Sequence, residues 1–133
     1  MRRVLLVEDS ASMRAFVRAA LTSSAALGQL EIAEAQSGFD ALRLLPRGPW
    51  DLVITDINMP DINGLELISF IKKNEAHKAT PILIISTASS DRDRERGMTL
   101  GASGYLVKPF TSEALAEHVL AQMGAASASG AHG

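Results

Sequence analysis

The sequence predicts a doubly wound α/β fold, in which a parallel five-stranded sheet is flanked by five helices. Two observations support this prediction: five short apolar runs recur along the chain, and each is followed by a segment with helical periodicity or helix-capping residues. Strands that alternate with helices in this way are typical of parallel sheets covered on both faces. The 133 residues suffice for one such domain and leave no room for a second folded module.

The apolar runs have the character of buried strands. Four of them are rich in Val, Ile and Leu and nearly continuous in apolarity, as expected of strands buried on both faces of a parallel sheet. The second run alternates between acidic and apolar residues, which indicates an edge strand with one wetter face. In chain order, the predicted strands are Val4–Val7, Glu31–Ala35, Leu52–Thr55, Ile82–Ile85 and Tyr105–Val107.

The segments between the runs carry helix signals. Apolar residues recur at the spacing of one helix face, and Ser or Thr followed by an acidic residue marks several N-termini. The first two predicted helices are Ser12–Leu21 and a helix that is capped by Ser37 and ends near Leu45. The third is Gly64–Lys73, with Leu65, Ile68 and either Ile71 or Phe70 facing inward. The fourth begins at Ser90 and is closed by Gly101, and the fifth is capped at Thr111, with Leu115, Val119 and Leu120 as its apolar stripe.

Composition excludes several classes of protein. The net charge of −2 argues against a nucleic-acid-binding surface, and the absence of Cys excludes disulfides and thiolate metal sites. No apolar run approaches the roughly 20 residues that span a bilayer. The first run stops at Glu8, too early for a signal peptide. We therefore predict a cytoplasmic protein without membrane insertion, with a folded domain over residues 1–123 and a disordered tail over residues 124–133.

Chemically capable residues follow four of the five predicted strands. In open α/β sheets, ligands bind beyond the carboxyl ends of the strands, so side chains at these positions are expected to gather at one rim. In chain order, the residues are Glu8 and Asp9, Asp56, Ser86 and Thr87, and Lys108 and Pro109.

This set of residues suits phosphoryl transfer. Three carboxylates at one rim would raise one another's pKa values unless a cation lay among them, and Mg²⁺ prefers such oxygen ligands. A carboxylate nucleophile beside Mg²⁺ and an ammonium group can accept a phosphoryl group as an aspartyl phosphate. Any one of these residues alone would be about as often a helix cap or a solvated loop residue, but their shared position at strand ends favours the chemical interpretation.

The chain resembles the receiver domain of response regulators, in particular the stand-alone, CheY-like type of chemotaxis systems. The resemblance covers roughly residues 2–123. It rests on Val-Leu-Leu-Val-Glu-Asp-Ser, on Asp-Leu-Val-Ile-Thr-Asp-Ile-Asn-Met-Pro-Asp-Ile-Asn-Gly and on Gly-Ala-Ser-Gly-Tyr-Leu-Val-Lys-Pro-Phe, in this order and spacing. It implies a flavodoxin-like sheet with the strand order 2-1-3-4-5.

The resemblance also implies a role for each residue of the rim. Asp56 matches the phosphoacceptor. Glu8 and Asp9 match the acidic pair that holds Mg²⁺, with Asp9 as the direct ligand and Glu8 acting largely through water. Asn58 matches the position whose backbone carbonyl completes the metal shell. Lys108 matches the lysine that pairs with the phosphoryl oxygens.

Further positions match the residues of this family that change conformation on phosphorylation, called the switch residues. Ser86, rather than the adjacent Thr87, is the expected switch hydroxyl, because it lies 30 residues after Asp56 and 22 before Lys108. Tyr105 matches the aromatic residue whose ring turns inward when that hydroxyl moves. The accessory positions are Thr87, where the family often has a small residue, Ala88, where chemotaxis regulators often have an acidic one, and Pro109, which is often preceded by a cis peptide.

The implied function is that of a single-domain response regulator in a two-component system. A histidine kinase would donate the phosphoryl group, and the surface of the fourth helix, fifth strand and fifth helix would bind a downstream protein, in chemotaxis, motility control or a phosphorelay. Such a protein is a phosphoacceptor rather than a conventional enzyme, although it can catalyse its own phosphorylation and dephosphorylation.

Two alternatives come from other functional classes. A haloacid-dehalogenase-like phosphatase would also place a nucleophilic Asp at a strand end, but it needs a second Asp where Asn58 stands. A receiver-like interaction module would act without phosphorylation, but degenerate members usually lose the Asp or the Lys, and both are present here. The three histidines, His77, His118 and His132, are dispersed and are expected to lie at the surface.

Overall fold

Five parallel strands form a single sheet in the order β2-β1-β3-β4-β5 in this computed structural model, which describes residues 1–87 and 91–132, with side chains through residue 124. The predicted fold class and strand order are therefore confirmed. The strands are β1 (Arg2–Val7), β2 (Leu30–Ala35), β3 (Leu52–Thr55), β4 (Ile82–Ser86) and β5 (Gly104–Val107).

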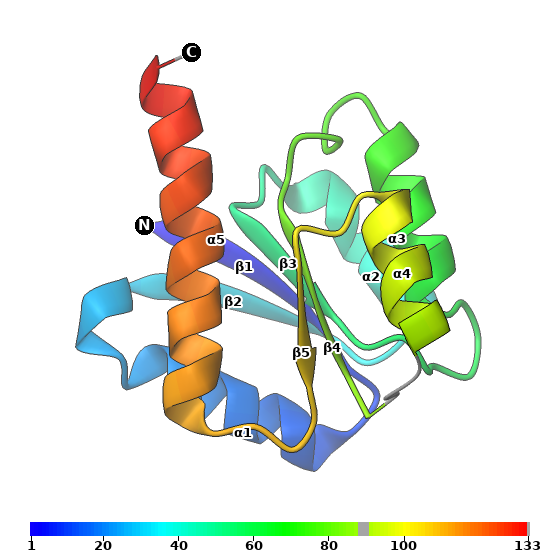
Figure 1. The fold of residues 1–133 in the computed structure, drawn as a ribbon, viewed down its shortest axis with the longest axis horizontal. Coiled ribbons are helices and arrows are strands. Elements are labelled where there is room, and N and C mark those ends of the chain that lie inside the picture. The colour runs from blue at the N-terminus through cyan, green and yellow to red at the C-terminus, as the bar shows by residue number, and fades with distance from the viewer. Residues whose placement is uncertain (88–90, 133) are drawn as a thin grey trace.

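Helices cover both faces of this sheet (Figure 1). Helices α1 and α5 lie on one face, and α2, α3 and α4 lie on the other. The helices are α1 (Ala11–Thr22), α2 (Gly38–Leu44), α3 (Gly64–Lys73), α4 (Asp91–Leu100) and α5 (Ser112–His132), with short 3-10 helices η1 (Ala25–Leu27) and η2 (Leu45–Arg47).

The central strands supply both layers of the core. In β1, Leu5 and Val7 pack with the layer of α2 and α3, whereas Val4 and Leu6 pack with α1 and α5. All four side chains are fully buried. Successive residues of a strand point to opposite faces, so a continuous apolar run is what a sheet covered on both sides requires. Each such side chain contributes about 1.5–3 kcal/mol through burial.

Short polar side chains fix the helix starts that position the site. The Ser10 hydroxyl accepts a hydrogen bond from the Met13 N–H (3.2 Å) at the start of α1, and the Ser37 hydroxyl accepts one from Asp40 (3.1 Å) at the start of α2. At α3, Asn63 and Glu66 form a reciprocal capping box. These bonds satisfy N–H groups that have no partner within the helix. The predicted cap at Ser37 is confirmed.

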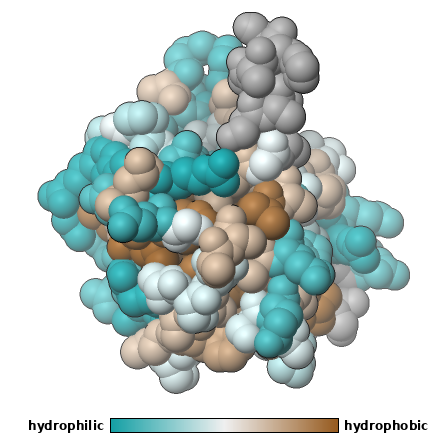
Figure 2. Space-filling model, turned by 90° about the vertical axis from the view of Figure 1, so that its left-hand side faces the viewer, coloured by the Kyte–Doolittle hydropathy of each residue, from teal (hydrophilic) through white to brown (hydrophobic). Residues whose placement is uncertain are grey.

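Charged side chains protect the open edge of the sheet at β2. The Arg18 guanidinium donates to the backbone carbonyl of Ile32 (2.9 Å) and pairs with Glu34 (2.6 Å). Arg3 pairs with Glu31 (3.1 Å). On the side of the molecule that includes β2, hydrophilic residues are interspersed with hydrophobic ones (Figure 2). Charges of this kind discourage pairing of an exposed strand with another chain.

The structure settles one open expectation about burial and corrects two others. Ile71, not Phe70, faces the core from α3, since Phe70 is 50% exposed. Leu120 is exposed, and α5 instead buries Met123 one turn beyond Val119. The expectation of a surface position for His77 is wrong: it is buried, because the loop after α3 packs against the segment at Gly48, where a Cβ atom would lie 3.0 Å from the His77 ring.

The last helix is longer than the sequence suggests. The backbone of α5 continues to His132, through the segment that we expected to be disordered. The disorder of that segment and the domain boundary at residue 123 stay predictions. Within the described part of the chain, no helix combines the length and apolarity needed to cross a membrane.

A close backbone contact joins α3 to the end of β3. The Gly64 N–H donates to the carbonyl of Ile57 (2.7 Å), and a Cβ atom on Gly64 would lie 2.1 Å from the carbonyl oxygen of Asp56. Any side chain here would push the helix away from the loop, because backbone atoms on the other side cannot rotate aside.

We expect Gly64→Ala to lower the free energy of unfolding by about 1–3 kcal/mol through this overlap. Urea titration followed by the fluorescence of Trp50, the only tryptophan, would measure the loss. Gly124→Ala is the matched control, since nothing lies within 4 Å of its added methyl group. Equal stabilities of the two variants would contradict the close contact.

Candidate functional site

The register of the sheet brings the chemically capable residues together. Val7 of β1 lies opposite Thr55 of β3, so the two strands end side by side. The next residues, Glu8 and Asp56, leave the sheet at the same edge, and the Asp56 N–H donates to the Val7 carbonyl (3.1 Å). The strand ends therefore deliver two carboxylates to one point, as the order of the strands requires.

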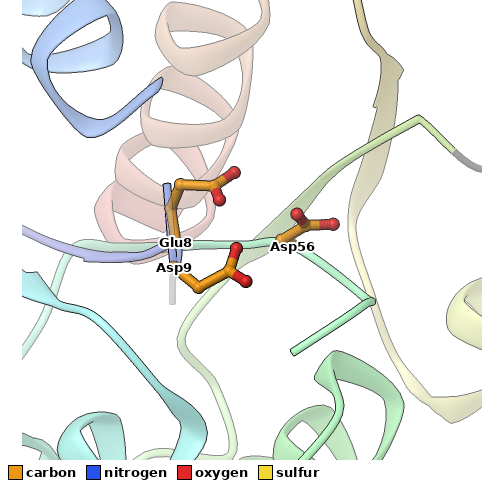
Figure 3. Close-up of side chains that lie close together, drawn as sticks. All are labelled: Glu8, Asp9 and Asp56. Atoms are coloured by element: carbon orange, nitrogen blue, oxygen red, sulfur yellow. The ribbon is translucent and has the colours of Figure 1, made fainter. Parts of the chain in front are cut away.

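Three carboxylates meet at this edge. Glu8, Asp9 and Asp56 each contribute one oxygen to a group whose members all lie within 4.8 Å of one another (Figure 3). Glu8 and Asp56 are buried, and Asp9 is exposed. Hard oxygen ligands, one of them open to solvent, suit a divalent cation that keeps several water molecules, such as Mg²⁺.

Lys108 provides the positive charge of the site. Its Nζ donates to Glu8 Oε1 (2.5 Å) and to Asp56 Oδ2 (3.0 Å), and its side chain is only 10% exposed. Its backbone N–H donates to the carbonyl of Ser86 (2.9 Å), which fixes the start of the Lys108 side chain beside β4. The peptide bond between Lys108 and Pro109 is cis, as the family resemblance implies.

The two oxygens of Asp56 have different partners. Oδ1 accepts hydrogen bonds from the backbone N–H groups of Ile57 (2.7 Å) and Asn58 (3.4 Å), whereas Oδ2 faces Lys108. One oxygen is thus held by the loop, and the other lies beside the ammonium group. This arrangement fixes the orientation of the carboxylate and turns Oδ2 towards Lys108.

Burial and charge shift the pKa values of this cluster. Burial raises the pKa of Glu8 above its ordinary value, although hydrogen bonds from Lys108 and Ser10 act against that rise. Burial alone would lower the pKa of Lys108, but its hydrogen bonds to Glu8 and Asp56 outweigh this effect and raise it. Lys108 therefore stays protonated, and its single positive charge lies beside a group of three carboxylates.

The predicted switch residues lie beside the cluster. Ser86 ends β4 and is fully buried, whereas the neighbouring Thr87 is exposed. Ala88 lies outside the described residues. Tyr105 of β5 is partly buried, which raises the pKa of its phenol, while a hydrogen bond with Ser86 acts in the opposite direction. Ser86 and Tyr105 are thus in contact. The roles inferred for these residues, and for the backbone carbonyl of Asn58, stay predictions.

Two further residues position the site and were missed from the sequence. The Arg14 guanidinium donates to the backbone carbonyl of Glu8 (2.7 Å) and so ties α1 to the acidic pair. The Asp61 carboxylate accepts hydrogen bonds from the N–H groups of Phe39 (2.9 Å) and Gly38 (3.1 Å), which lower its pKa to about 2. Asp61 thereby joins the loop after β3 to the start of α2, a contact between distant segments that no local motif indicates.

Comparisons with known proteins agree with this geometry. The family model of the response regulator receiver domain matches residues 4–120. A chemotaxis protein CheY homolog of Campylobacter jejuni is 33% identical over 130 residues, which cover 97% of this chain and 98% of that protein. The structure of the chemotaxis response regulator CheY4 of Vibrio cholerae superimposes with a TM-score of 0.83 at 34% identity, covering 92% of this chain and 98% of that one.

We expect Lys108→Met to lower the free energy of unfolding by about 3 kcal/mol at pH 7, because it leaves two buried carboxylates without their cation. The loss should shrink as the pH falls towards 5. Without Lys108, the pKa of Glu8 in the folded protein lies still further above its unfolded value, so the folded state binds the extra proton and gains stability as the pH falls. Urea unfolding at both pH values would measure this.

Lys73→Met is the control for this experiment. Lys73 is exposed on α3, so the same change of charge should alter the stability by no more than about 0.5 kcal/mol at either pH. A loss in Lys108→Met that does not depend on pH would show that packing, rather than charge, is the role of Lys108.

Proposed function

The chain belongs to the response regulator receiver domain family, and from this premise we propose that it is a single-domain response regulator switched by a phosphoryl group on Asp56. The observation that carries the proposal is the contact between Asp56 Oδ2 and Lys108 Nζ (3.0 Å), beside the buried Glu8 and the exposed Asp9. Charged groups of opposite sign that are held together largely away from solvent are more typical of a functional site than of a surface loop.

The donor set fits Mg²⁺ as the cofactor. The site holds three carboxylates and one ammonium group, so a divalent cation would balance the charge that remains. Glu8, Asp9 and Asp56 would hold the ion, with the backbone carbonyl of Asn58 as a further ligand. When bound, Mg²⁺ would neutralise negative charge on the phosphoryl oxygens.

The residues of the chain would then carry the transfer. An oxygen of Asp56 attacks the phosphorus of a phosphohistidine on the partner kinase, and the bond from phosphorus to the imidazole nitrogen breaks as the new O–P bond forms. Lys108 donates a hydrogen bond to a phosphoryl oxygen, and the backbone N–H groups of Ile57 and Asn58 keep the carboxylate oriented. Positioning of this kind supplies most of what phosphoryl transfer needs.

Phosphorylation would switch a protein-binding surface. The phosphoryl group adds roughly −1.5 to −2 charge at the rim, and Lys108 and the Ser86 hydroxyl would move to satisfy it. Tyr105 would follow Ser86, and the surface of α4, β5 and α5 would change for a downstream protein. The protein would act in the cytoplasm without nucleic-acid or membrane partners. A chemotaxis or motility pathway is supported by the relative in Campylobacter jejuni.

Phosphorylation of Asp56 can be tested directly by intact mass after incubation with a small phosphodonor and Mg²⁺. We expect one added phosphoryl group in the unmodified protein, and none in Asp56→Asn or in the presence of EDTA. Asp51→Asn is the matched control and should still be modified, because Asp51 directly precedes β3 at the opposite end from Asp56. Absence of any addition would favour an interaction module that works without phosphorylation.

Binding of Mg²⁺ can be tested separately by calorimetry and unfolding. At a free concentration of 100 times Kd, Mg²⁺ should stabilise the protein by about 2.7 kcal/mol. Asp9→Asn should weaken Mg²⁺ binding about tenfold or more, while its exposed position leaves the apo protein folded. The same affinity in Asp9→Asn and Asp51→Asn would rule Asp9 out as a ligand.

A further inference from the structure

Tyr105 contacts a charged side chain of α4 as well as the switch hydroxyl. The Cζ atom of Arg94 lies 5.9 Å from the centroid of the Tyr105 ring. The ring packs against the core layer formed with α2 and α3, and the Ser86 side chain lies close enough to the phenol to lower its pKa. The Tyr105 side chain therefore connects the end of β4, which faces the phosphoacceptor, to the outer surface of α4.

We propose that Arg94 is a positioning residue that holds the Tyr105 ring in its resting orientation and so sets how readily the switch turns. This inference rests on the proposed function, because it concerns regulation of the same site. Among the described residues, Lys108 and not Arg94 forms the ion pair with Asp56, so Arg94 would act through the tyrosine ring.

The physical basis is the attraction between a cation and the negative face of an aromatic ring. An inward turn of Tyr105, towards the space that Ser86 leaves, would take the ring away from Arg94 and lose this attraction. At an exposed site the loss corresponds to about a two- to five-fold change in the ratio of the two ring orientations, or ~0.5–1 kcal/mol. Arg94 thus opposes activation moderately, without locking the protein in one state.

The charges around Tyr105 are consistent with this role. Besides burial and the bond with Ser86, the pKa of the phenol is raised by the charges of Asp93 and Asp56 and lowered by that of Arg94. Charges on both α4 and Asp56 therefore influence the phenol. A more negative Asp56 would change the balance between these two influences.

The same helix offers a matched control. Arg92, Arg94 and Arg96 are all exposed on α4. Among the described residues, only Arg94 of these three lies over an aromatic ring. Arg96→Gln therefore removes the same charge from the same helix without removing the contact with Tyr105.

The contact can be measured because Tyr105 is the only tyrosine in the chain. With ¹³C-labelled tyrosine, NMR reports the ring of this residue alone. We expect Arg94→Gln to shift the ring signals and to raise the pKa of the phenol, because a nearby cation is lost. Arg94→Lys, which keeps a cation, should restore most of both effects, and Arg96→Gln should cause neither. The inference is overturned if Arg94→Gln and Arg96→Gln behave alike.

A second arm measures the bias on the switch, with beryllofluoride and Mg²⁺ as the mimic of phosphorylation. In the free protein, Arg94→Gln should move the ring signals towards their beryllofluoride-bound positions, with a two- to five-fold higher population of the inward ring. Movement in the opposite direction, or none, would overturn the bias. If beryllofluoride leaves the ring of the unmodified protein unchanged, the proposed switch itself fails, and the first arm distinguishes that failure because it needs no phosphoryl mimic.

Discussion

The ammonium group of Lys108 lies between two buried carboxylates, 2.5 Å from Glu8 and 3.0 Å from Asp56, and the charge balance of the strand ends depends on it. Because β1 and β3 end in register, the fold places these two acidic side chains side by side in buried positions. Like charges at such a place repel strongly, and each also loses its hydration. Lys108 follows β5 and compensates both effects. The strand order that brings the two carboxylates together therefore also requires a cation at this place.

The same ion pairs leave the site short of positive charge. Lys108 divides its hydrogen bonds between Glu8 and Asp56, while Asp9 lies nearby in solvent. A phosphoryl group on Asp56 would compete with Glu8 for this ammonium group, and Lys108 would then have two alternative sets of partners. An element with two such arrangements is what a phosphorylation switch needs. The raised pKa of Glu8 reflects the cost of burying its negative charge. A divalent cation among the carboxylates would reduce that cost.

Much of this could be predicted from the sequence because it depends on local patterns. Continuous apolar runs marked the buried strands, and Ser37 marked the start of α2, since capping and burial on both faces act over a few residues. The strand order required the family resemblance. The contacts that complete the site join residues far apart in the chain: Arg14 to the carbonyl of Glu8, and Asp61 to the start of α2. His77 shows the same limit, because its burial depends on a loop that packs over it from another part of the chain.

A response to the proposed phosphorylation would appear where the fold is least constrained. The strands that carry Ser86 and Tyr105 are paired within the sheet, and β4 is fully buried. Helix α4 buries only Gly97, which lies against Ile84, whereas α3 buries five residues. An element with few buried apolar contacts can move at a small cost in free energy. A single contact, such as that of Arg94 with Tyr105, therefore forms a larger share of the contacts of α4 than it would on a well-buried helix. A modest cation–π attraction could for this reason influence the proposed turn of the ring.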